Sequence, residues 1–440
     1  MLRRAVWGGD VRRRARGMRI GFVYEPFDAR AGSFGAHGYF LACELIRRGH
    51  ELWGPGLPAM PGIVPLPDNK WGKLRMARHA DLLYIRVGIL HWLERCTWLR
   101  LLRPSCPVVW EINTTSEEIL GSETPDAAAV RRCRTDVRRK RRMARLVDAA
   151  VCIGEPLAEY ARRCYGIRRC VAVPNGGDPS AYMPNGGGTV LATMPERFKV
   201  FWAGDAGLPW QGLGVLVEAA RRCERIAPDV LFVIMLGGKR PRTDLPHYSN
   251  TLYLAGADRL TAQRYLADAD CLAAVTVACR WRGLPSGYAL KVLEAMAARK
   301  PVIADDDAAD LVRDGVDGLM VRQGSVDALV QAILRLRDDA GLRERLAACA
   351  RARIESAFTW RHVVDRIEPL LLELVAGRRT AGNTGVTVSG SKPHPGRRRF
   401  PNCLRRGPRN AEPAYVCPVP ERPVRKRNRA AGCGGERIDR

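Results

Sequence analysis

The chain has 440 residues, of which 46% are apolar, so it is too long for one ordinary domain and can build the cores of two α/β domains. Its formal charge of +26 is unevenly spread: residues 1–17 carry +5 and residues 377–440 carry +12, which leaves only +9 for the rest. An excess of that size does not require a nucleic-acid partner. The fourteen cysteines include no C-x2-C pair, which argues against a zinc or disulfide scaffold and favours a reducing cytoplasm.

The two ends differ from the rest because neither has an apolar periodicity. Residues 1–17 hold six Arg against one Asp, and Met18 stands directly before a strand-like run. A real basic extension and translation from Met18 therefore both fit the sequence. Residues 377–440 are filled with Arg, Pro and Gly, which predicts a disordered tail.

The first half reads as strands alternating with helices. A strand is expected at residues 20–24, followed by a Gly-rich loop and a helix from about Tyr39 to the Arg48-Gly49-His50 stop. The further expected strands are residues 81–85, 107–112, 149–153 and 170–173. The alternation predicts a doubly wound parallel sheet over residues 18–178, followed by a Pro- and Gly-rich linker at 179–197.

The same pattern restarts after the linker and continues over residues 198–357. Its expected strands are residues 198–203, 231–236, 251–254, 269–274 and 301–304. Residues 358–376 then predict an amphipathic closing helix. The predicted fold class is α/β, with two Rossmann-like parallel-sheet domains.

The strongest functional signal is GLPSGYALKVLEAMAARK, residues 283–300. Ser286 is a candidate N-cap, and the amides from Gly287 to Ala289 would point outward at a helix N-terminus, where they favour a diphosphate. Lys291 and Glu294 lie three residues apart on one helical face. The alternative for these two residues is an ordinary surface ion pair.

This segment, with LVRDGVDGLMV after it, resembles the C-terminal signature of glycosyltransferase family 4. In the family's Glu-x7-Glu pattern the second Glu, which holds the nucleotide ribose, aligns with Glu294, whereas the first falls at Ser286. The sub-pattern S-P-L-K-x-x-E is followed with Ala289 in place of Pro. The resemblance implies that Lys291 contacts the diphosphate or sugar and offsets the charge of the leaving group.

The chain departs from the family after the first strand of the second domain. Relatives carry an Arg and a Lys there in the pattern G-R-x…K-G, but here GDAGLPWQG (residues 204–212) lacks both cations. Two alternatives stay open: a working variant that uses Lys291, Arg280 and Arg282, or an impaired catalyst.

Motifs in the first half support the same resemblance. GSFGAH (residues 32–37) is similar to the family's G-G-x-G-x-H opening, and VPNGGD (residues 173–178) to its turn before the linker. DLLYIR and PVVWEIN resemble two strands that would place Arg86, Glu111 and Asn113 at strand ends, although many relatives have His at the position of Asn113. The ordinary alternatives are a packed His37 and a hydrogen-bonded structural Glu111.

The resemblance covers residues 18–376 and implies a GT-B fold, in which two Rossmann-like doubly wound domains face a cleft and residues 358–376 cross back to the first domain. It implies retaining transfer of a sugar from a nucleoside-diphosphate sugar to a glycan, glycolipid or small-molecule acceptor, in envelope or polysaccharide biosynthesis, with no metal or other cofactor. Asp305-Asp306-Asp307 is expected to be a loop acid cluster. The candidate catalytic residues are Lys291, Asn113 and Glu111, and the candidate nucleotide-sugar residues are Glu294, Ser286, Gly287, Tyr288, Ala289, Gly204, Gln211, Gly35 and His37.

Two other classes of function remain as alternatives. The first is a non-catalytic GT-B relative that acts as a binding or scaffold protein. The second is peripheral attachment to an anionic membrane through the basic ends, as an accessory property of a cytoplasmic protein at the inner membrane face. A nucleic-acid partner is not expected, and no motif specifies the donor sugar, the base or the acceptor.

Overall fold

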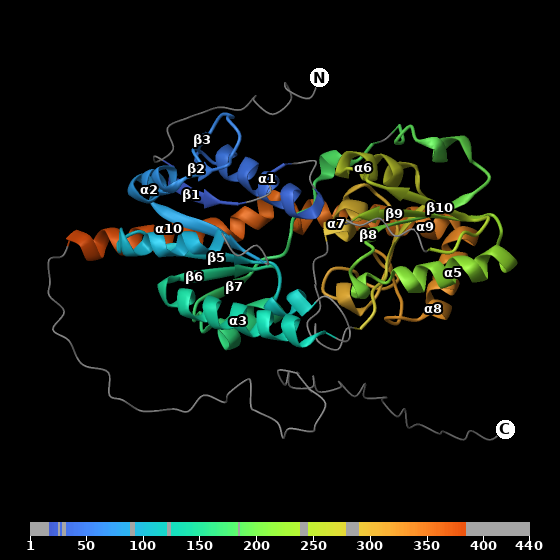
Figure 1. Cartoon of the computed structure of the whole chain (residues 1–440). Helices are drawn as coiled ribbons and strands as arrows, with labels where there is room; N and C mark the ends of the chain where they lie inside the picture. The colour runs from blue at the N-terminus through green and yellow to red at the C-terminus, as the bar shows by residue number, and fades with distance from the viewer. Residues whose placement is uncertain are drawn as a thin grey trace, which may run out of the picture. The chain divides into compact units, whose positions relative to one another are not determined.

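The computed structural model describes residues 17–24, 27–28, 32–88, 93–120, 125–183, 185–237, 245–278 and 290–383. These residues form two parallel β-sheets with helices on both faces of each (Figure 1). This arrangement confirms the predicted α/β class and the doubly wound parallel sheets. None of the helices within the described ranges combines the length and apolarity needed to cross a bilayer.

The first sheet has seven strands in the order β3-β2-β1-β4-β5-β6-β7. Their bounds are β1 Arg19–Val23, β2 Glu51–Pro55, β3 Ile63–Leu66, β4 Leu82–Val87, β5 Val108–Ile112, β6 Ala149–Cys152 and β7 Cys170–Ala172. Strands β4, β5 and β6 are buried along their whole length, as expected for parallel strands covered on both faces. Strands β2 and β3 were not predicted, because the Gly and Pro residues of β2 read as turn signals although β2 pairs directly with β1.

The second sheet has six strands in the order β10-β9-β8-β11-β12-β13. Their bounds are β8 Phe198–Asp205, β9 Val230–Gly237, β10 Thr251–Ala255, β11 Cys271–Ala274, β12 Val302–Ala304 and β13 Leu319–Met320. The two-residue strand β13 was not predicted, since no pattern of period two can be read over so short a run.

The helices cover both faces of each sheet. Their bounds are α1 Gly32–Arg47, α2 Lys70–His79, α3 Ala127–Met143, α4 Glu155–Tyr160, α5 Leu213–Ile226, α6 Arg259–Asp268, α7 Leu290–Ala297, α8 Val326–Asp338, α9 Ala340–Ala357 and α10 Trp360–Asn383, with a 3₁₀ helix η1 at Leu93–Leu101. In the first sheet, α1 and α10 share one core, while α2, η1 and α4 share the core of the opposite face.

The expectation that helix α1 begins near Tyr39 is wrong, because the Gly-rich segment is itself the beginning of the helix at Gly32. Small residues are needed there for close packing rather than for a loop. A Cβ atom at Gly38 would lie 2.3 Å from the Tyr24 ring at the end of β1. Gly38 therefore allows α1 to approach the strand end closely.

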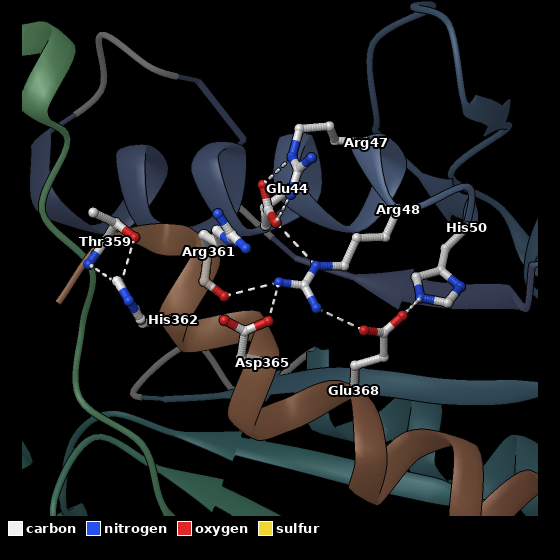
Figure 2. A network of polar contacts seen from close by, with 9 residues as sticks. All are labelled: Glu44, Arg47, Arg48, His50, Thr359, Arg361, His362, Asp365 and Glu368. Carbon is white, nitrogen blue, oxygen red and sulfur yellow. Dashed lines mark hydrogen bonds and ion pairs between the residues drawn. The ribbon is translucent and has the colours of Figure 1, made fainter. Parts of the chain in front are cut away.

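Helix α10 belongs to the core of the first sheet although it follows the second sheet in the chain. Its apolar residues between Val363 and Val375 pack with those of α1, and the backbone N–H of Gly177 donates to the carbonyl of Phe358 over 2.6 Å. Figure 2 shows Arg48 at the end of α1 bonded to Asp365 and Glu368 of α10 over 2.6 and 2.7 Å. The helix runs to Asn383, past the predicted end at residue 376.

Candidate functional site

Both sheets have a point at which the order of their strands reverses, which is where ligands bind in open α/β sheets. In the second sheet that point lies between β8 and β11, and in the first it lies between β1 and β4. Ligands of such sheets sit outside the carboxyl ends of the strands. A donor site is therefore expected beside the residues that follow β8, and an acceptor site beside the residues that follow β1.

Lys291 lies at the reversal point of the second sheet, on the first turn of α7. Its Nζ is 3.4 Å from the carbonyl oxygen of Ala203, 3.3 Å from Oε1 of Gln211 and 5.4 Å from the centre of the Trp202 ring. These partners belong to the end of β8 and to the turn after it. The structure thus brings together the predicted residues Lys291 and Gln211 and places them beside Gly204.

The turn after β8 is fixed by close packing. A Cβ atom at Gly204 would lie 2.6 Å from Oε1 of Gln211 and 2.6 Å from the Trp202 ring. Gly212 has φ +71°, and a Cβ there would lie 2.3 Å from the carbonyl oxygen of Val275, after β11. The turn that replaces the family's two cations is therefore held against the end of β11 and cannot easily shift.

Glu294 lies one helical turn after Lys291 but has a different partner. Its Oε1 accepts a hydrogen bond from Nε of Arg259 on α6 over 2.6 Å. The Arg259 guanidinium also lies 4.9 Å from the centre of the Phe40 ring on α1. Burial raises the pKa of Glu294 above its usual value although Arg259 opposes the shift. The structure does not show the surface ion pair between Lys291 and Glu294.

Glu111 forms the centre of a buried polar cluster at the ends of β1, β4 and β5. Its side chain is 2% exposed. Its Oε1 accepts from Tyr24, Arg86 and Asn113 over 2.9, 3.2 and 3.0 Å, and its Oε2 accepts from Tyr84 over 2.7 Å. This is the arrangement expected of the structural carboxylate that was one of the two alternatives.

His37 is the sixth member of this cluster. Its Nε2 lies 3.1 Å from Oε1 of Glu111, and its ring packs edge-on against Trp360 of α10 at 4.9 Å. Burial alone would raise the pKa of Glu111, but His37, Arg86 and Tyr84 together lower it to about 2. Glu111 is thus a carboxylate held ionised in the interior, and His37 is packed rather than exposed.

Two predicted residues remain: Asn113, which is itself a member of this cluster, and Gly35, two residues before His37 on α1. Asn113 follows β5, and its Oδ1 is buried with no hydrogen-bond donor among the residues that the structure describes. Gly35 is buried on the first turns of α1. Of these two, Asn113 presents a buried side-chain oxygen that a ligand could use.

The loop acid Asp305 is bonded to protein donors. The carboxylate of Asp305 is fully buried and accepts hydrogen bonds from the backbone and hydroxyl groups of Thr276 and from the N–H of Asp307. No group of three His, Cys, Asp or Glu side chains arranged to hold a metal occurs within the described ranges. Asp305 caps the short helix that follows it, as a loop acid does.

Part of the predicted site falls outside the described residues. These positions are Ser286, Gly287, Tyr288, Ala289, Arg280 and Arg282, together with residues 1–16 and 384–440 of the two ends. The residues that the sequence analysis missed are Arg259, Trp202, Tyr24, Tyr84 and Trp360. Arg259 gave no signal because it lies 35 residues before its partner Glu294.

Comparisons with known proteins bear directly on the second sheet. Residues 197–339 match a family model described as "Glycosyl transferases group 1". The chain is 30% identical over 213 residues to D-inositol 3-phosphate glycosyltransferase of Stackebrandtia nassauensis, which covers 45% of this chain and 47% of the relative. It is 28% identical over 173 residues to GDP-mannose-dependent monoacylated alpha-(1-6)-phosphatidylinositol monomannoside mannosyltransferase of Corynebacterium glutamicum, covering 37% and 44%. The chain therefore spans about half the length of the curated relatives it matches.

Solved structures extend the similarity to both sheets. Sucrose-phosphate synthase of Thermosynechococcus elongatus matches with a TM-score of 0.62 at 15% identity, over 82% of this chain and all of that one. Anabaena HepE in complex with UDP-glucose matches with a TM-score of 0.62 at 17% identity, over 81% of this chain and all of that one. At such identities the likeness concerns the fold alone. The chain thus has the fold of GT-B proteins, and residues 197–339 of its second α/β domain match the group 1 glycosyl transferase model, as the resemblance implied.

Proposed function

We propose that this protein is a glycosyltransferase that moves a sugar from a nucleoside-diphosphate sugar to a glycan, glycolipid or small-molecule acceptor. The observation that carries the proposal is the position of Lys291 at the reversal point of the second sheet, within 3.3 Å of Gln211 and 3.4 Å of the end of β8. A cation there faces the place where a departing diphosphate gathers negative charge.

The proposal gives each described residue near Lys291, and each on the acceptor side, a role that fits its position. Lys291 stabilises the departing diphosphate, and Glu294 accepts hydrogen bonds from the ribose, with Arg259 fixing one of its oxygens. Gly204 and Gln211 line the diphosphate side through the fixed turn after β8. On the acceptor side, Asn113 Oδ1 accepts from a hydroxyl group, while Glu111 positions Asn113 through the 3.0 Å hydrogen bond between them.

The finer points of the reaction are also part of the proposal. Transfer proceeds with retention of the anomeric configuration. It needs no metal, because Lys291 supplies the positive charge at the leaving group. Relatives named for inositol phosphate and phosphatidylinositol mannoside acceptors support a role in envelope or polysaccharide biosynthesis, at the inner face of the membrane. Undiminished transfer in excess EDTA is expected, and activity that requires an added divalent cation would contradict the metal-free reaction.

A binding or scaffold role is the second candidate, and one observation favours it. The turn after β8 is tightly packed without either of the cations that relatives carry there. The two candidates differ in turnover rather than in nucleotide binding. A GT-B scaffold could retain affinity for a nucleotide and still release no free nucleoside diphosphate.

The proposal is tested in two steps on the full chain. A thermal-shift screen with UDP-, GDP- and ADP-sugars is expected to show one preferred base, because a ligand that binds only the native state stabilises it by mass action. Release of nucleoside diphosphate from the preferred donor is then measured with inositol phosphate, phosphoinositide and simple glycan acceptors. Binding without release with any acceptor would favour the scaffold role, and no binding of any of the three nucleotide sugars would contradict the transferase.

A further inference from the structure

Helix α3 and the turn after it carry an unusual concentration of positive charge. Residues 127–146 contain nine Lys or Arg against a single acid, Asp136, which is buried and bonded to Arg139 and Lys140. Six of the arginines are exposed: Arg131, Arg132, Arg138, Arg141, Arg142 and Arg145. The helix is therefore amphipathic, with an acid-free cationic outer face.

These six arginines differ from many other arginines in the described part of the chain. Arg48, Arg162, Arg221 and Arg299, for example, each pair with a nearby carboxylate. None of the six makes an ion pair or side-chain hydrogen bond with any residue in the described part of the chain. Arg131, Arg138, Arg142 and Arg145 follow at intervals of seven, four and three residues, so they share one stripe. Like charges on one stripe repel each other unless an anionic partner is present.

Exposed apolar side chains lie beside this cationic face. Trp98, Leu101 and Leu102, on or just after η1, are 48%, 59% and 62% exposed, and η1 packs against both α2 and α3. On α2, Trp71 and Leu74 are also exposed, and that helix has no acidic residue. Five of the ten exposed large apolar side chains of the described residues thus belong to this one layer. The layer covers a single face of the first sheet.

We propose that the outer face of α2, η1 and α3 binds the surface of a membrane that contains anionic phospholipids. The arginines would contact lipid phosphates, and Trp98, Leu101, Leu102 and Trp71 would enter the interface between headgroups and acyl chains. This face lies within the folded first domain, so it differs from the basic ends that the sequence analysis connected with a membrane. The proposal does not depend on the transferase activity.

The combination of side chains favours a membrane over a nucleic acid. Phosphate contacts alone would explain the arginines with either partner. Exposed leucines next to a tryptophan, however, gain free energy by entering a hydrocarbon interface, and aliphatic side chains offer little to a nucleic-acid backbone. The exposed apolar residues are therefore what distinguishes a membrane from a nucleic acid as the partner of this surface.

The test uses the full chain, with both ends intact, in co-sedimentation with vesicles. Wild type is expected to bind vesicles of phosphatidylcholine and phosphatidylglycerol, and to bind vesicles of phosphatidylcholine alone much more weakly. A variant with Arg138→Gln, Arg141→Gln, Arg142→Gln and Arg145→Gln is expected to bind the anionic vesicles roughly 100-fold more weakly, since each arginine near such a surface contributes appreciably. The matched control carries Arg225→Gln, Arg335→Gln, Arg345→Gln and Arg366→Gln, which remove the same charge from exposed positions elsewhere.

A second variant separates the two classes of partner. Trp98→Ser, Leu101→Ser and Leu102→Ser together are expected to reduce vesicle binding about tenfold or more while leaving binding to heparin unchanged, because only a membrane uses the apolar side chains. All these positions are exposed, so each variant should unfold within a few degrees of wild type. Equal loss in the control, unchanged vesicle binding in the arginine variant, or binding to RNA with no binding to vesicles would overturn the proposal.

Discussion

The charged groups at the two reversal points are held very differently. Glu111, in the first sheet, is 2% exposed and has five partners from four elements and the segments beside them. Lys291, in the second sheet, is half-buried, and its polar contacts with Ala203 and Gln211 are long, at 3.4 and 3.3 Å. A charge enclosed by buried partners gives rigidity, whereas a half-buried charge beside the strand ends can also contact a ligand.

The difference indicates that the cluster around Glu111 positions the elements of the first domain, whereas Lys291 takes part in the reaction. The cluster around Glu111 joins β1, β4, β5, α1 and, through the Trp360 ring, α10. Its main effect should therefore be on the stability of the first domain. The site around Lys291 should instead affect turnover while leaving stability nearly unchanged.

Replacing Glu111 should produce the largest effect. Glu111→Ala leaves Arg86, His37 and two tyrosine hydroxyls without their buried acceptor, and we expect a loss of about 3–5 kcal/mol in the free energy of unfolding. Urea denaturation followed by circular dichroism measures it. The matched control is Glu118→Ala, on the segment just after β5. A loss below about 1 kcal/mol for Glu111→Ala would show that the cluster around Glu111 does not stabilise the first domain.

The same carboxylate should make stability depend on acidic pH. The pKa of Glu111 is lowered from the usual 4.5 to about 2, so its contribution is complete above about pH 4.5 and is lost as the pH falls toward 2. The shift corresponds to about 3 kcal/mol. The stability gap between wild type and Glu111→Gln should therefore narrow over that window. A gap that stays constant from pH 5 to about pH 3 would contradict the assignment.

Removing the charge of Lys291 should leave the fold intact and slow turnover. Lys291→Met keeps the length of the side chain, and we expect kcat to fall roughly 10²–10³-fold, because the cation acts on the departing diphosphate. Steady-state kinetics with the preferred donor give the value, and Lys291→Arg should recover part of it. A fall in the unfolding temperature comparable to that of Glu111→Ala would instead make Lys291 a structural residue.

The sequence predicted the strands of the two sheets better than the side-chain contacts between distant segments of the chain. The run of β9 is continuously apolar, and β4 and β5 are apolar apart from Arg86 and Glu111 near their ends, so burial on both faces can be read directly from them. Lys291 and Gln211 were both selected, but their 3.3 Å contact depends on how α7 packs against β8. Neither the Glu294 contact with Arg259 nor that of His37 with Trp360 has any local signal, because each joins distant segments.

Arg259 allows the donor side of the comparison to be tested without touching Lys291. Arg259→Gln removes the charge that opposes the raised pKa of Glu294, so a larger fraction of Glu294 should be protonated near neutral pH. We expect nucleotide affinity to weaken about tenfold, and more at pH 6 than at pH 8. Isothermal titration with the preferred nucleotide measures both. The control is Arg264→Gln on the same helix, whose guanidinium bonds to the carbonyl of Gly187. Equal weakening in both variants would assign the effect to α6 as a whole.

Gln211 should give the smallest effect, and its replacement tests how much the contact between Gln211 and Lys291 contributes to turnover. Its Oε1 is 3.3 Å from Nζ, so the hydrogen bond is weak, and Gln211→Ala should cost about 0.5–1 kcal/mol in transition-state stabilisation. That is roughly a two- to five-fold decrease in kcat. The control is Gln331→Ala, an exposed position on α8. A decrease as large as that of Lys291→Met would mean that Gln211 fixes the cation in place. The two reversal points would then both depend on rigid side-chain contacts, and exposure alone would distinguish them.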